Sequence, residues 1–471
     1  MPAKNLLPEG RRPPLFLLIS IVTILLFGLG WLVATLILPV REYDFFELFP
    51  FVLLCGITVD YVVVLTVQSM ALAFKIVIAL AVIGLISFAK KIFKGGKKLF
   101  FARSFWAFFW AIFIVLFFAV AMVAEPLIDW DARSIWFLHA KMIYAAEALC
   151  YDTGLAHPSV YFSHPGYPKL VPVIAAQLAS FMGYWNEYLP KLSLFFVLLP
   201  PVFWLLSFAR KSWSFVFLLS AFPFALHRLM WNGYMDGYLA IYLAVAMLLF
   251  GRFIQSWRSL DFVSCVACFL FLPNLKREGL LLLFLGFLAI VMTGVLLKKR
   301  HRLRMDENFS IQMRQVCGWL LLVAPTLLWY VFYTNAWGIT KDAGILGDNG
   351  LSLFMSRIND GETLKLIVAN IFSQLHLPVL LAALMIVLLL AVRRGLLIEH
   401  LAPLLIGSLY AIGLVITYLA LDFEINWAMA NSTNRTTLML AACLIVSVFW
   451  VLLYLERLEV IAGRRSVRQA I

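Results

Sequence analysis

Residues 125–172 read EPLIDWDARSIWFLHAKMIYAAEALCYDTGLAHPSVYFSHPGYPKLVP, a polar segment in a chain that otherwise consists mostly of long apolar runs. Its charged and histidine side chains lie among tryptophans and prolines; they are Glu125, Asp129, Asp131, Arg133, His139, Lys141, Glu147, Asp152, His157 and His164. Because loops between packed elements commonly carry binding and catalytic groups, this segment is where we expect chemistry or recognition.

The composition places the whole chain in a membrane. Of 471 residues, 63% are hydrophobic and 13% are charged, whereas soluble domains have about 45–50% apolar and about 25% charged residues. Apolar runs long enough to cross a hydrocarbon core of ~30 Å recur throughout the chain. We therefore predict an all-α, polytopic integral membrane protein of about twelve transmembrane helices. The net charge of +13 comes from short basic loops, a positive-inside pattern that predicts a lipid bilayer and no nucleic acid as partner.

The N-terminal region leaves its topology open. The run Leu15–Leu38 is too long for a signal-peptide core, and basic residues before it place the N-terminus in the cytoplasm. Two spans within residues 48–89, broken near Asp60 or Gln68, would then put the basic segment 90–103 outside. We prefer one crossing with a re-entrant piece; the alternative is an external N-terminus.

Three regions follow from this organisation. Residues 1–104 form N-terminal helices and a basic cytoplasmic loop, residues 105–455 form the transmembrane core, and residues 456–471 form a basic cytoplasmic tail. The run Phe105–Val123 delivers the external loop, residues 124–190, to the outer face.

That loop is expected to contain juxtamembrane helices. Asp131–Leu149 reads as an amphipathic helix whose apolar side would contact the membrane through Trp136, Phe137, Met142 and Ile143. Tyr167–Gly183 resembles another span, but the alternation of basic loops leaves no place for one. We expect it to lie along, or dip into, the outer interface.

Candidate catalytic carboxylates stand at the start of the loop. Asp129 and Asp131 flank Trp130 at a membrane–water boundary, where a carboxylate can act as a general base toward an attacking hydroxyl. Solvation at the interface is the simpler reading of either residue alone. Arg133 and Lys141 provide cations on the following helix.

Further polar groups stand at the same outer level. In His164-Pro165-Gly166-Tyr167-Pro168, His164 and Tyr167 lie in a rigid turn, and His164 either binds substrate or only satisfies local backbone. Tyr234 and Asp236 begin a helix, where Asp236 either caps it or lines a cavity.

Two cationic segments complete the set. Lys276, Arg277 and Glu278 separate two apolar runs, and charges at such depth are costly unless they are paired or face water. Arg435 opens the last helix, either as an interface anchor or as a bidentate phosphate ligand.

Taken in order, these segments resemble bacterial GT-C-fold glycosyltransferases, multi-pass enzymes related to the protein mannosyltransferases and the lipid A aminoarabinose transferase. The resemblance covers roughly residues 105–455 and rests on WDARSIW at 130–136, HPGYP at 164–168, GYMD at 233–236, KREG at 276–279 and Arg435. Its carboxylate motif differs from the Asp-Glu pair of several subfamilies, which leaves open whether Asp131 or Asp129 is the base.

The resemblance implies a function. Such enzymes take a sugar from a polyprenyl-phosphate carrier and transfer it, with inversion, to a glycan, lipid or protein acceptor on the external face of the bacterial inner membrane. Asp131 would deprotonate the acceptor hydroxyl, and Lys276, Arg277 and Arg435 would stabilise the leaving lipid phosphate. The sequence indicates no metal or cofactor site.

Two alternatives remain at this stage. An O-antigen polymerase or ligase typically relies on outer-loop arginines, in which this chain is poor. A transporter or flippase for lipid-linked glycans would need ionisable groups near the mid-plane of several spans, whereas here they collect at the outer ends. If the enzyme interpretation holds, we expect Asp131, His164, Asp236, Lys276 and Arg435 to line one cavity.

Overall fold

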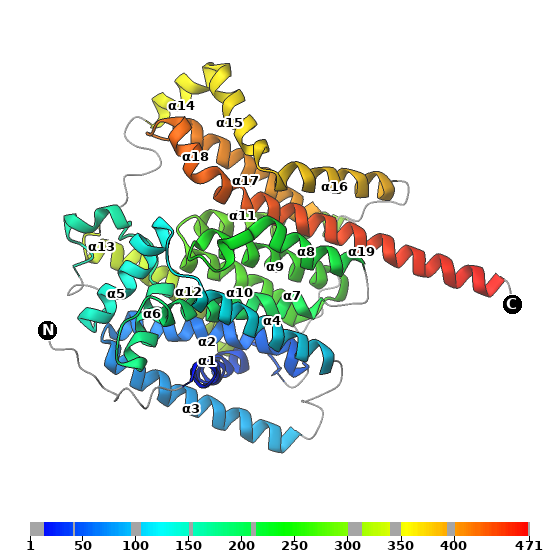
Figure 1. Cartoon of the computed structure of the whole chain (residues 1–471). Helices are drawn as coiled ribbons and strands as arrows, with labels where there is room; N and C mark the ends of the chain where they lie inside the picture. The colour runs from blue at the N-terminus through cyan, green and yellow to red at the C-terminus, as the bar shows by residue number, and fades with distance from the viewer. Residues whose placement is uncertain are drawn as a thin grey trace.

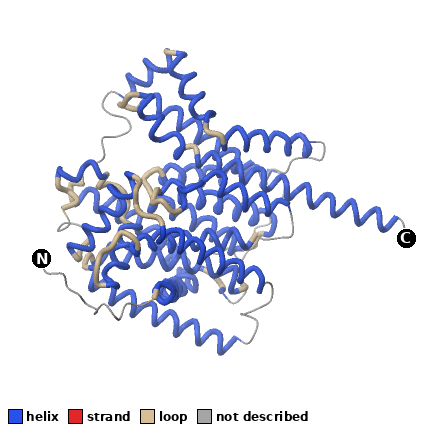
Figure 2. The backbone as a smooth tube through the Cα atoms, in the orientation of Figure 1, coloured by secondary structure: helices blue, strands red, loops and turns tan. Residues whose placement is uncertain are grey.

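The computed structural model describes residues 14–40, 43–95, 105–149, 154–208, 213–299, 313–339, 350–392 and 401–469. Within these ranges the chain is helical without strands, as the blue tube of Figure 2 makes plain, and its only β-type pairing is an isolated bridge between Ser69 and Ala148. The prediction of an all-α protein is confirmed.

The helices run through the whole chain (Figure 1). The longer ones are α1 (Leu15–Ile37), α2 (Phe45–Val67), α3 (Met70–Gly95), α4 (Phe105–Ala124), α7 (Leu192–Ser207), α9 (Met235–Ser256), α10 (Ser259–Leu275), α11 (Gly279–Lys299), α12 (Met313–Leu327), α16 (His376–Val392), α17 (Leu401–Ala420) and α19 (Leu438–Gln469). The shorter ones are α5 (Phe137–Ala146), α6 (Leu170–Met182), α8 (Trp213–Leu226), α13 (Thr334–Ala336), α14 (Gly350–Asn359), α15 (Gly361–Ser373) and α18 (Ile425–Thr436).

Many of these helices can cross a bilayer, so the chain is a multi-pass membrane protein. Among the described residues, 9 helical stretches are long and apolar enough, or 10 if α15 and α16, bent by 77°, form one span. Two of the predicted spans correspond to α8 and α10, which have only 14 and 17 residues. The total of about twelve spans therefore stays a prediction.

The first three helices differ from the preferred single crossing, because α2 and α3 are both full-length helices joined at Gln68. Asp60 does not break α2; it is buried inside it and accepts a 2.8 Å hydrogen bond from Gln177. Glycines allow α1 and α2 to touch through their backbones. A Cβ at Gly30 would lie 1.7 Å from the Val52 carbonyl oxygen, so only glycine fits this crossing.

Contacts at its two ends orient α2. Near its start, Glu47 pairs with Arg258, which precedes α10 in the basic link after α9. Beyond its other end, the Met70 amide donates to the Glu147 carbonyl at 3.0 Å, inside the external loop. Helix α1, antiparallel to α2, therefore begins at the end of the molecule that holds the loop.

The start of α1 thus lies at the same end as the loop, which favours the alternative of an external N-terminus if the loop is external; the side of the membrane stays a prediction. The basic residues before Leu15, which favour a cytoplasmic N-terminus, lie outside the described residues. Because α2 and α3 are both long enough to cross the membrane, the chain makes one more crossing before residue 95 than a single crossing of residues 48–89 would give, and this reverses the side expected for the N-terminus. Residues 90–95, the first part of the basic segment, end α3 on the side opposite the loop, and residues 96–104 lie outside the described ranges.

The external loop packs into the protein more than the sequence suggested. The predicted helix Asp131–Leu149 consists of a π-helical turn, η4 (Ala132–Trp136), followed by α5. Its expected membrane-facing side chains Trp136, Phe137 and Ile143 are buried, so that part of the prediction is wrong. An apolar stripe does not reveal whether lipid or another helix covers it, and here α6 packs against α5.

The segment 167–183 is correctly predicted not to be a full span. Helix α6 has 13 residues, or ~20 Å at 1.5 Å per residue, which is shorter than the hydrocarbon core. It is enclosed by α2, α5 and α7, so the expectation that it lies exposed along the interface is wrong, whereas a position that dips into the interface stays a prediction.

The C-terminal part adds a second helical layer at the loop end of the molecule. Helices α14, α15 and α18 stack together and project from the bundle, while α19 runs away from them toward the C-terminus (Figure 1). Arg357 of α14 joins this layer to the end of α17 by donating to the Leu419 carbonyl at 3.3 Å and to the Leu421 carbonyl, just beyond the helix, at 2.5 Å. The predicted outer loop 334–375 thus contains α14 and α15, and its residues 340–349 lie outside the described ranges.

Candidate active site

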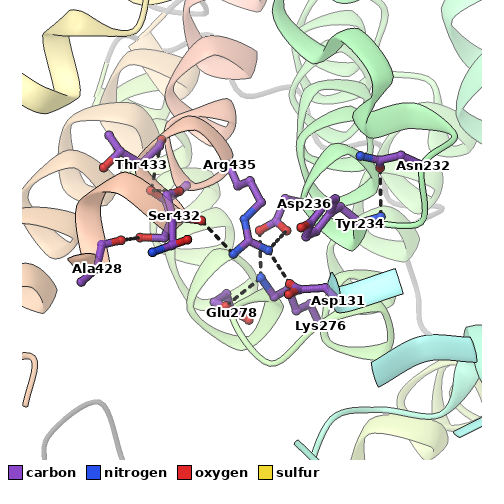
Figure 3. Close-up of polar contacts among 12 residues, drawn as sticks. Asp131, Asn232, Tyr234, Asp236, Lys276, Glu278, Ala428, Ser432, Thr433 and Arg435 are labelled. Atoms are coloured by element: carbon purple, nitrogen blue, oxygen red, sulfur yellow. Dashed lines mark hydrogen bonds and ion pairs between the residues drawn. The ribbon is translucent and has the colours of Figure 1, made fainter. Parts of the chain in front are cut away.

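Four elements that are remote in the sequence meet at the loop end. Asp131 precedes η4, Asp236 lies in the first turn of α9, Lys276 ends α10 and Arg435 lies in the last turn of α18. Figure 3 shows their side chains converging on one point between these elements. The structure thus brings together four of the five residues that the sequence analysis assigned to one site.

Arg435 is the centre of the cluster. Its Nη1 donates to Asp131 Oδ2 across 304 residues of chain and lies 3.9 Å from Asp236 Oδ2. Its guanidinium carbon is 4.5 Å from the ring centroid of Tyr234, and Nη2 donates to the Asn431 carbonyl at 3.1 Å. Arg435 is therefore an internal ion-pair partner and not only an interface anchor.

Lys276 forms the second cationic centre. Its Nζ donates to Asp236 Oδ1 at 2.8 Å and lies 3.1 Å from Glu278 Oε1. The side chains of Lys276 and Asp236 are only 8% and 4% exposed, so each needs the charge of the other. The N-cap position of α9 is Tyr234 and not Asp236. Asp236 therefore links Lys276 to Arg435.

A glycine permits the close approach of α9 to the loop. Gly233 has φ +99°, and a Cβ there would lie 2.6 Å from the Cβ of Ala132. Only glycine adopts this backbone conformation without strain. Because Ala132 follows Asp131 directly, this contact fixes the carboxylate beside Tyr234 and Asp236.

Three buried carboxylate oxygens at or near the cluster have no hydrogen-bond donor among the described residues. Asp129 Oδ2, Asp236 Oδ2 and Glu278 Oε2 are buried and accept no hydrogen bond from any described residue. Buried polar atoms normally have a partner, and exceptions call for an explanation. A ligand that carries several hydrogen-bond donors would satisfy these oxygens.

The Asp131–Arg435 pair is the accessible part of the cluster. Their side chains are 19% and 18% exposed, more than those of Lys276 and Asp236. Burial and the adjacent Asp131 carboxylate raise the pKa of the Tyr234 phenol, so this hydroxyl stays a neutral donor at physiological pH. A charged ligand would meet Asp131 and Arg435 first.

The other predicted site residues have different surroundings. Arg133 and Arg277 are exposed, and the exposed Lys141 lies 3.8 Å from Glu187. Asp129 makes no ion pair with Arg435 in this structure, but it lies close enough to Tyr234 to interact electrostatically. Of the two carboxylates, Asp131 is the one that pairs with Arg435, and the choice of base stays a prediction.

His164 is part of an aromatic stack beside the cluster. It adopts φ 51°, its ring stacks on Tyr167 at 5.1 Å, and Tyr167 stacks on Trp136 at 5.6 Å. Tyr167 lies close enough to Lys276 to interact with it electrostatically. The stack therefore adjoins the charged cluster.

A buried lysine was missed by the sequence analysis. Lys169 Nζ donates to the carbonyl oxygens of Pro165 and Tyr167 at 2.8 and 2.7 Å and to His139 Nδ1 at 3.1 Å. His139 Nε2 lies 2.9 Å from Ser163 Oγ. Burial and the charge of Lys169 hold the pKa of His139 well below its ordinary value, so the imidazole is neutral. The signal was available in the sequence: a lysine between a proline-rich turn and an apolar helix needs internal partners.

No group of three or more His, Cys, Asp or Glu residues in the described ranges is arranged to hold a metal ion. Comparison of the chain with protein-family models, curated proteins and solved structures finds no match.

Proposed function

We propose that this protein is a membrane glycosyltransferase of GT-C type that moves a sugar from a polyprenyl-phosphate carrier to an acceptor hydroxyl. The observation that carries the proposal is the contact of Asp131 with Arg435, joined through Asp236 to Lys276. It places a partly exposed carboxylate next to cations at the end of a membrane bundle. A lipid-borne phosphosugar requires this combination of groups.

The chemistry assigns a role to each group. Asp131 accepts the proton of the acceptor hydroxyl while that oxygen attacks the anomeric carbon from the face opposite the phosphate. The bond between the anomeric carbon and the phosphate oxygen breaks, and its electron pair leaves with the lipid phosphate. Arg435 and Lys276 stabilise the negative charge that develops on this leaving group.

The resting cluster must rearrange for this reaction. Arg435 holds the Asp131 carboxylate in this structure, so this ion pair must open before the carboxylate can accept a proton or the guanidinium can bind a phosphate. A donor phosphate offers the guanidinium a bidentate partner. Arg435 would then pass from the carboxylate to the phosphate, and Asp131 would be released to act as base.

Location and partners belong to the same proposal. We place the protein in the bacterial inner membrane with its site facing outward, where polyprenyl-phosphate sugars are the donors. The acceptor is a glycan, lipid or protein hydroxyl.

Purified protein in lipid nanodiscs, incubated with polyprenyl-phosphate sugars and scored for loss of donor, tests the proposal. We expect Asp131→Asn to lower the rate by about 10²–10⁴, the usual contribution of a general base. Glu187→Gln, which alters an exposed carboxylate that pairs with Lys141, is the control and should keep the wild-type rate. Equal turnover of Asp131→Asn and wild type would reject Asp131 as base, and no turnover of any donor would reject the enzyme class.

A further inference from the structure

Helices α14 and α15, which project from the bundle at the loop end, each carry a row of exposed apolar side chains. On α14 the row consists of Leu351, Met355 and Ile358, which are 76%, 53% and 43% exposed. On α15 it consists of Val368 and Phe372, which are 39% and 49% exposed. Residues three or four apart lie on one face of a helix, so each row forms a stripe. We call these five side chains the exposed stripes.

On α14 the stripe lies between a side that packs on the protein and a polar side. With about 3.6 residues per turn, Arg357 lies on a different side of the helix from the stripe, and its guanidinium donates to carbonyl oxygens at the end of α17. The stripe is bordered on its other side by Ser352, Ser356 and Asn359, which are all exposed. Helix α14 is therefore anchored to the protein, and its free surface has an apolar and a polar half.

Helix α15 has the same three sides. Ile367 and Ile371 are buried where α15 packs on α17 and α18. Glu362 and Lys365 are exposed on another side and pair with each other at 2.7 Å. By helical spacing, the stripe occupies the sector between these two sides. A free surface that is half apolar and half polar is typical of an amphipathic helix that lies in a membrane surface.

The connection to α16 places α15 at such a surface. Helix α16 has 17 residues, enough for a short span, and it runs alongside α19 (Figure 1). Its apolar side chains Val379, Ile386 and Leu389 are exposed, as expected for contact with lipid. Only Gln374 and Leu375 separate the two helices, so the end of α15 lies within about 11 Å of the start of α16. Because the bend between them is 77°, α15 runs nearly parallel to the membrane plane when α16 crosses it.

We propose that α14 and α15 lie in the membrane surface at the loop end and that their exposed stripes contact the acyl chains of that leaflet. The charges of this part of the chain favour acyl chains over headgroups as the partner. Within residues 350–375, Arg357 and Lys365 balance Asp360 and Glu362, so no net charge attracts anionic headgroups. The inference goes beyond the proposed function and does not depend on the transfer of a sugar.

A broken span is the alternative arrangement of α15 and α16. It would place the exposed Glu362 and Lys365 side chains in hydrocarbon, where charged groups are costly unless they face protein or water. A position in the membrane surface leaves both charges in water while the stripe of α15 enters the lipid. The distribution of charge on α15 therefore favours the surface position.

The depth of α15 also matters for the candidate site. Helix α15 packs on α18, whose last turn carries Arg435. Helices seated in the membrane surface would hold Arg435 at the level of the lipid headgroups. If the proposed function holds, this is the level at which the phosphate of a lipid-borne donor arrives.

The accessibility of spin labels tests the proposal. In the full-length protein without its six native cysteines, a single nitroxide label is attached at Met355→Cys or Phe372→Cys, and the protein is reconstituted in zwitterionic lipid nanodiscs. Oxygen concentrates in hydrocarbon and a nickel chelate stays in water, so the ratio of their collision rates with the label reports its depth. We expect collisions with oxygen to predominate at both sites, as they should at Ile386→Cys on α16.

Labels on the polar sides of the same helices are the matched controls. Ser356→Cys is on the polar side of α14, and Ala369→Cys is on that of α15. At both sites we expect collisions with the nickel chelate to predominate. Anionic lipid added to the nanodiscs should leave the four results unchanged.

Four results would overturn the proposal. A stripe label that collides mainly with the nickel chelate lies in water, and one that is shielded from both reagents is covered by protein, such as a second copy of this chain. A predominance of oxygen at Ala369→Cys as well would place the whole of α15 in hydrocarbon. A stripe label that enters lipid only when anionic lipid is present would assign the contact to headgroups.

The unmodified protein provides a second measurement, because removing six cysteines can perturb folding. Wild-type protein is irradiated in nanodiscs whose lipid carries a photoreactive diazirine on its acyl chain, and mass spectrometry locates the crosslinks. We expect crosslinks within residues 350–375 as well as in α16, and crosslinks in α16 alone would contradict the proposal. Neither measurement requires sugar transfer, so the proposed function and this inference can fail separately.

Discussion

At the scale of residues, the site is a set of charges that depend on one another. Asp236 is in contact with both Lys276 and Arg435, and Arg435 also holds Asp131. Water reaches Asp131 and Arg435 more readily than it reaches Lys276 and Asp236. We therefore expect substitutions of Asp131 or Arg435 to change ligand binding and catalysis, and substitutions of Lys276 or Asp236 to lower stability in addition.

Asp131→Asn should strengthen the binding of polyprenyl phosphate even as it prevents transfer. The carboxylate competes with the lipid phosphate for Arg435, so its removal should tighten binding about threefold to tenfold, or ~0.6–1.4 kcal/mol. Isothermal titration of short-chain polyprenyl phosphate into nanodiscs measures this effect, with Arg435→Gln expected to weaken binding. Unchanged or weaker binding to Asp131→Asn would show that the ion pair does not compete with the ligand.

Lys276→Met should destabilise the protein by about 3–5 kcal/mol, because it leaves Asp236 buried without its closest cation. Unfolding in detergent micelles measures the free-energy change. The double variant Lys276→Met/Asp236→Leu removes both buried charges and should recover most of the loss. A single variant as stable as wild type would mean that Asp236 does not need Lys276.

At the scale of elements, short segments of the loop depend on interior contacts. Helices α5 and α6 and the 3-10 turn η6 (Pro158–Ser163) are each short, and the Lys169–His139–Ser163 network ties them together. The network requires a neutral His139, whose pKa burial and Lys169 hold well below the ordinary value. The neighbouring His164 also lowers the pKa of His139.

This network predicts that the loop loses stability in acid. The unfolded segment takes up a proton on His139 at pH ~6.5, whereas the folded segment does so only at lower pH. Stability is therefore complete above pH ~6.5 and falls below it, by at most about 1.4 kcal/mol per pH unit for one proton. Hydrogen exchange of residues 158–163 between pH 7.5 and 5 measures the loss, and His139→Gln should remove the part due to this proton. A pH response that is the same in both proteins would place its origin elsewhere.

At the scale of the whole molecule, contacts between remote elements fix the direction of each helix. The Glu47–Arg258 pair and the pairing of residues 69 and 148 are at opposite ends of α2. They place the start of α1 at the same end as the external loop. The chain before α8 lies at the other end, because Ser207 accepts a hydrogen bond from Arg252, close to Arg258 in the chain. The positive-inside rule then predicts that the end of the molecule with the external loop faces outward.

Cysteine labelling tests this orientation. In a variant without the six native cysteines, Pro14→Cys and Gly154→Cys should react with an impermeant maleimide added to intact cells. Trp213→Cys should react only after the membrane is opened. Labelling of Pro14→Cys together with Trp213→Cys, and not with Gly154→Cys, would contradict the orientation and restore the cytoplasmic N-terminus.

The sequence by itself determined the class of the protein and the location of its polar groups. A chain that is 63% hydrophobic has few stable states other than helices in a bilayer, because lipid offers the backbone no hydrogen bonds. The same reasoning identified Asp131, Asp236, Lys276 and Arg435, because a charge beside an apolar run needs water or a partner.

Only the tertiary structure decided which partner each charge has and which apolar surface is covered. The pairing of Asp131 with Arg435 spans 304 residues, and no local pattern encodes contacts over such distances. Trp136 and Trp130 lie in one short motif, yet one is buried and the other is 66% exposed. Hydrophobicity favours the burial of apolar side chains, but the packing of helices against one another determines which of them are buried.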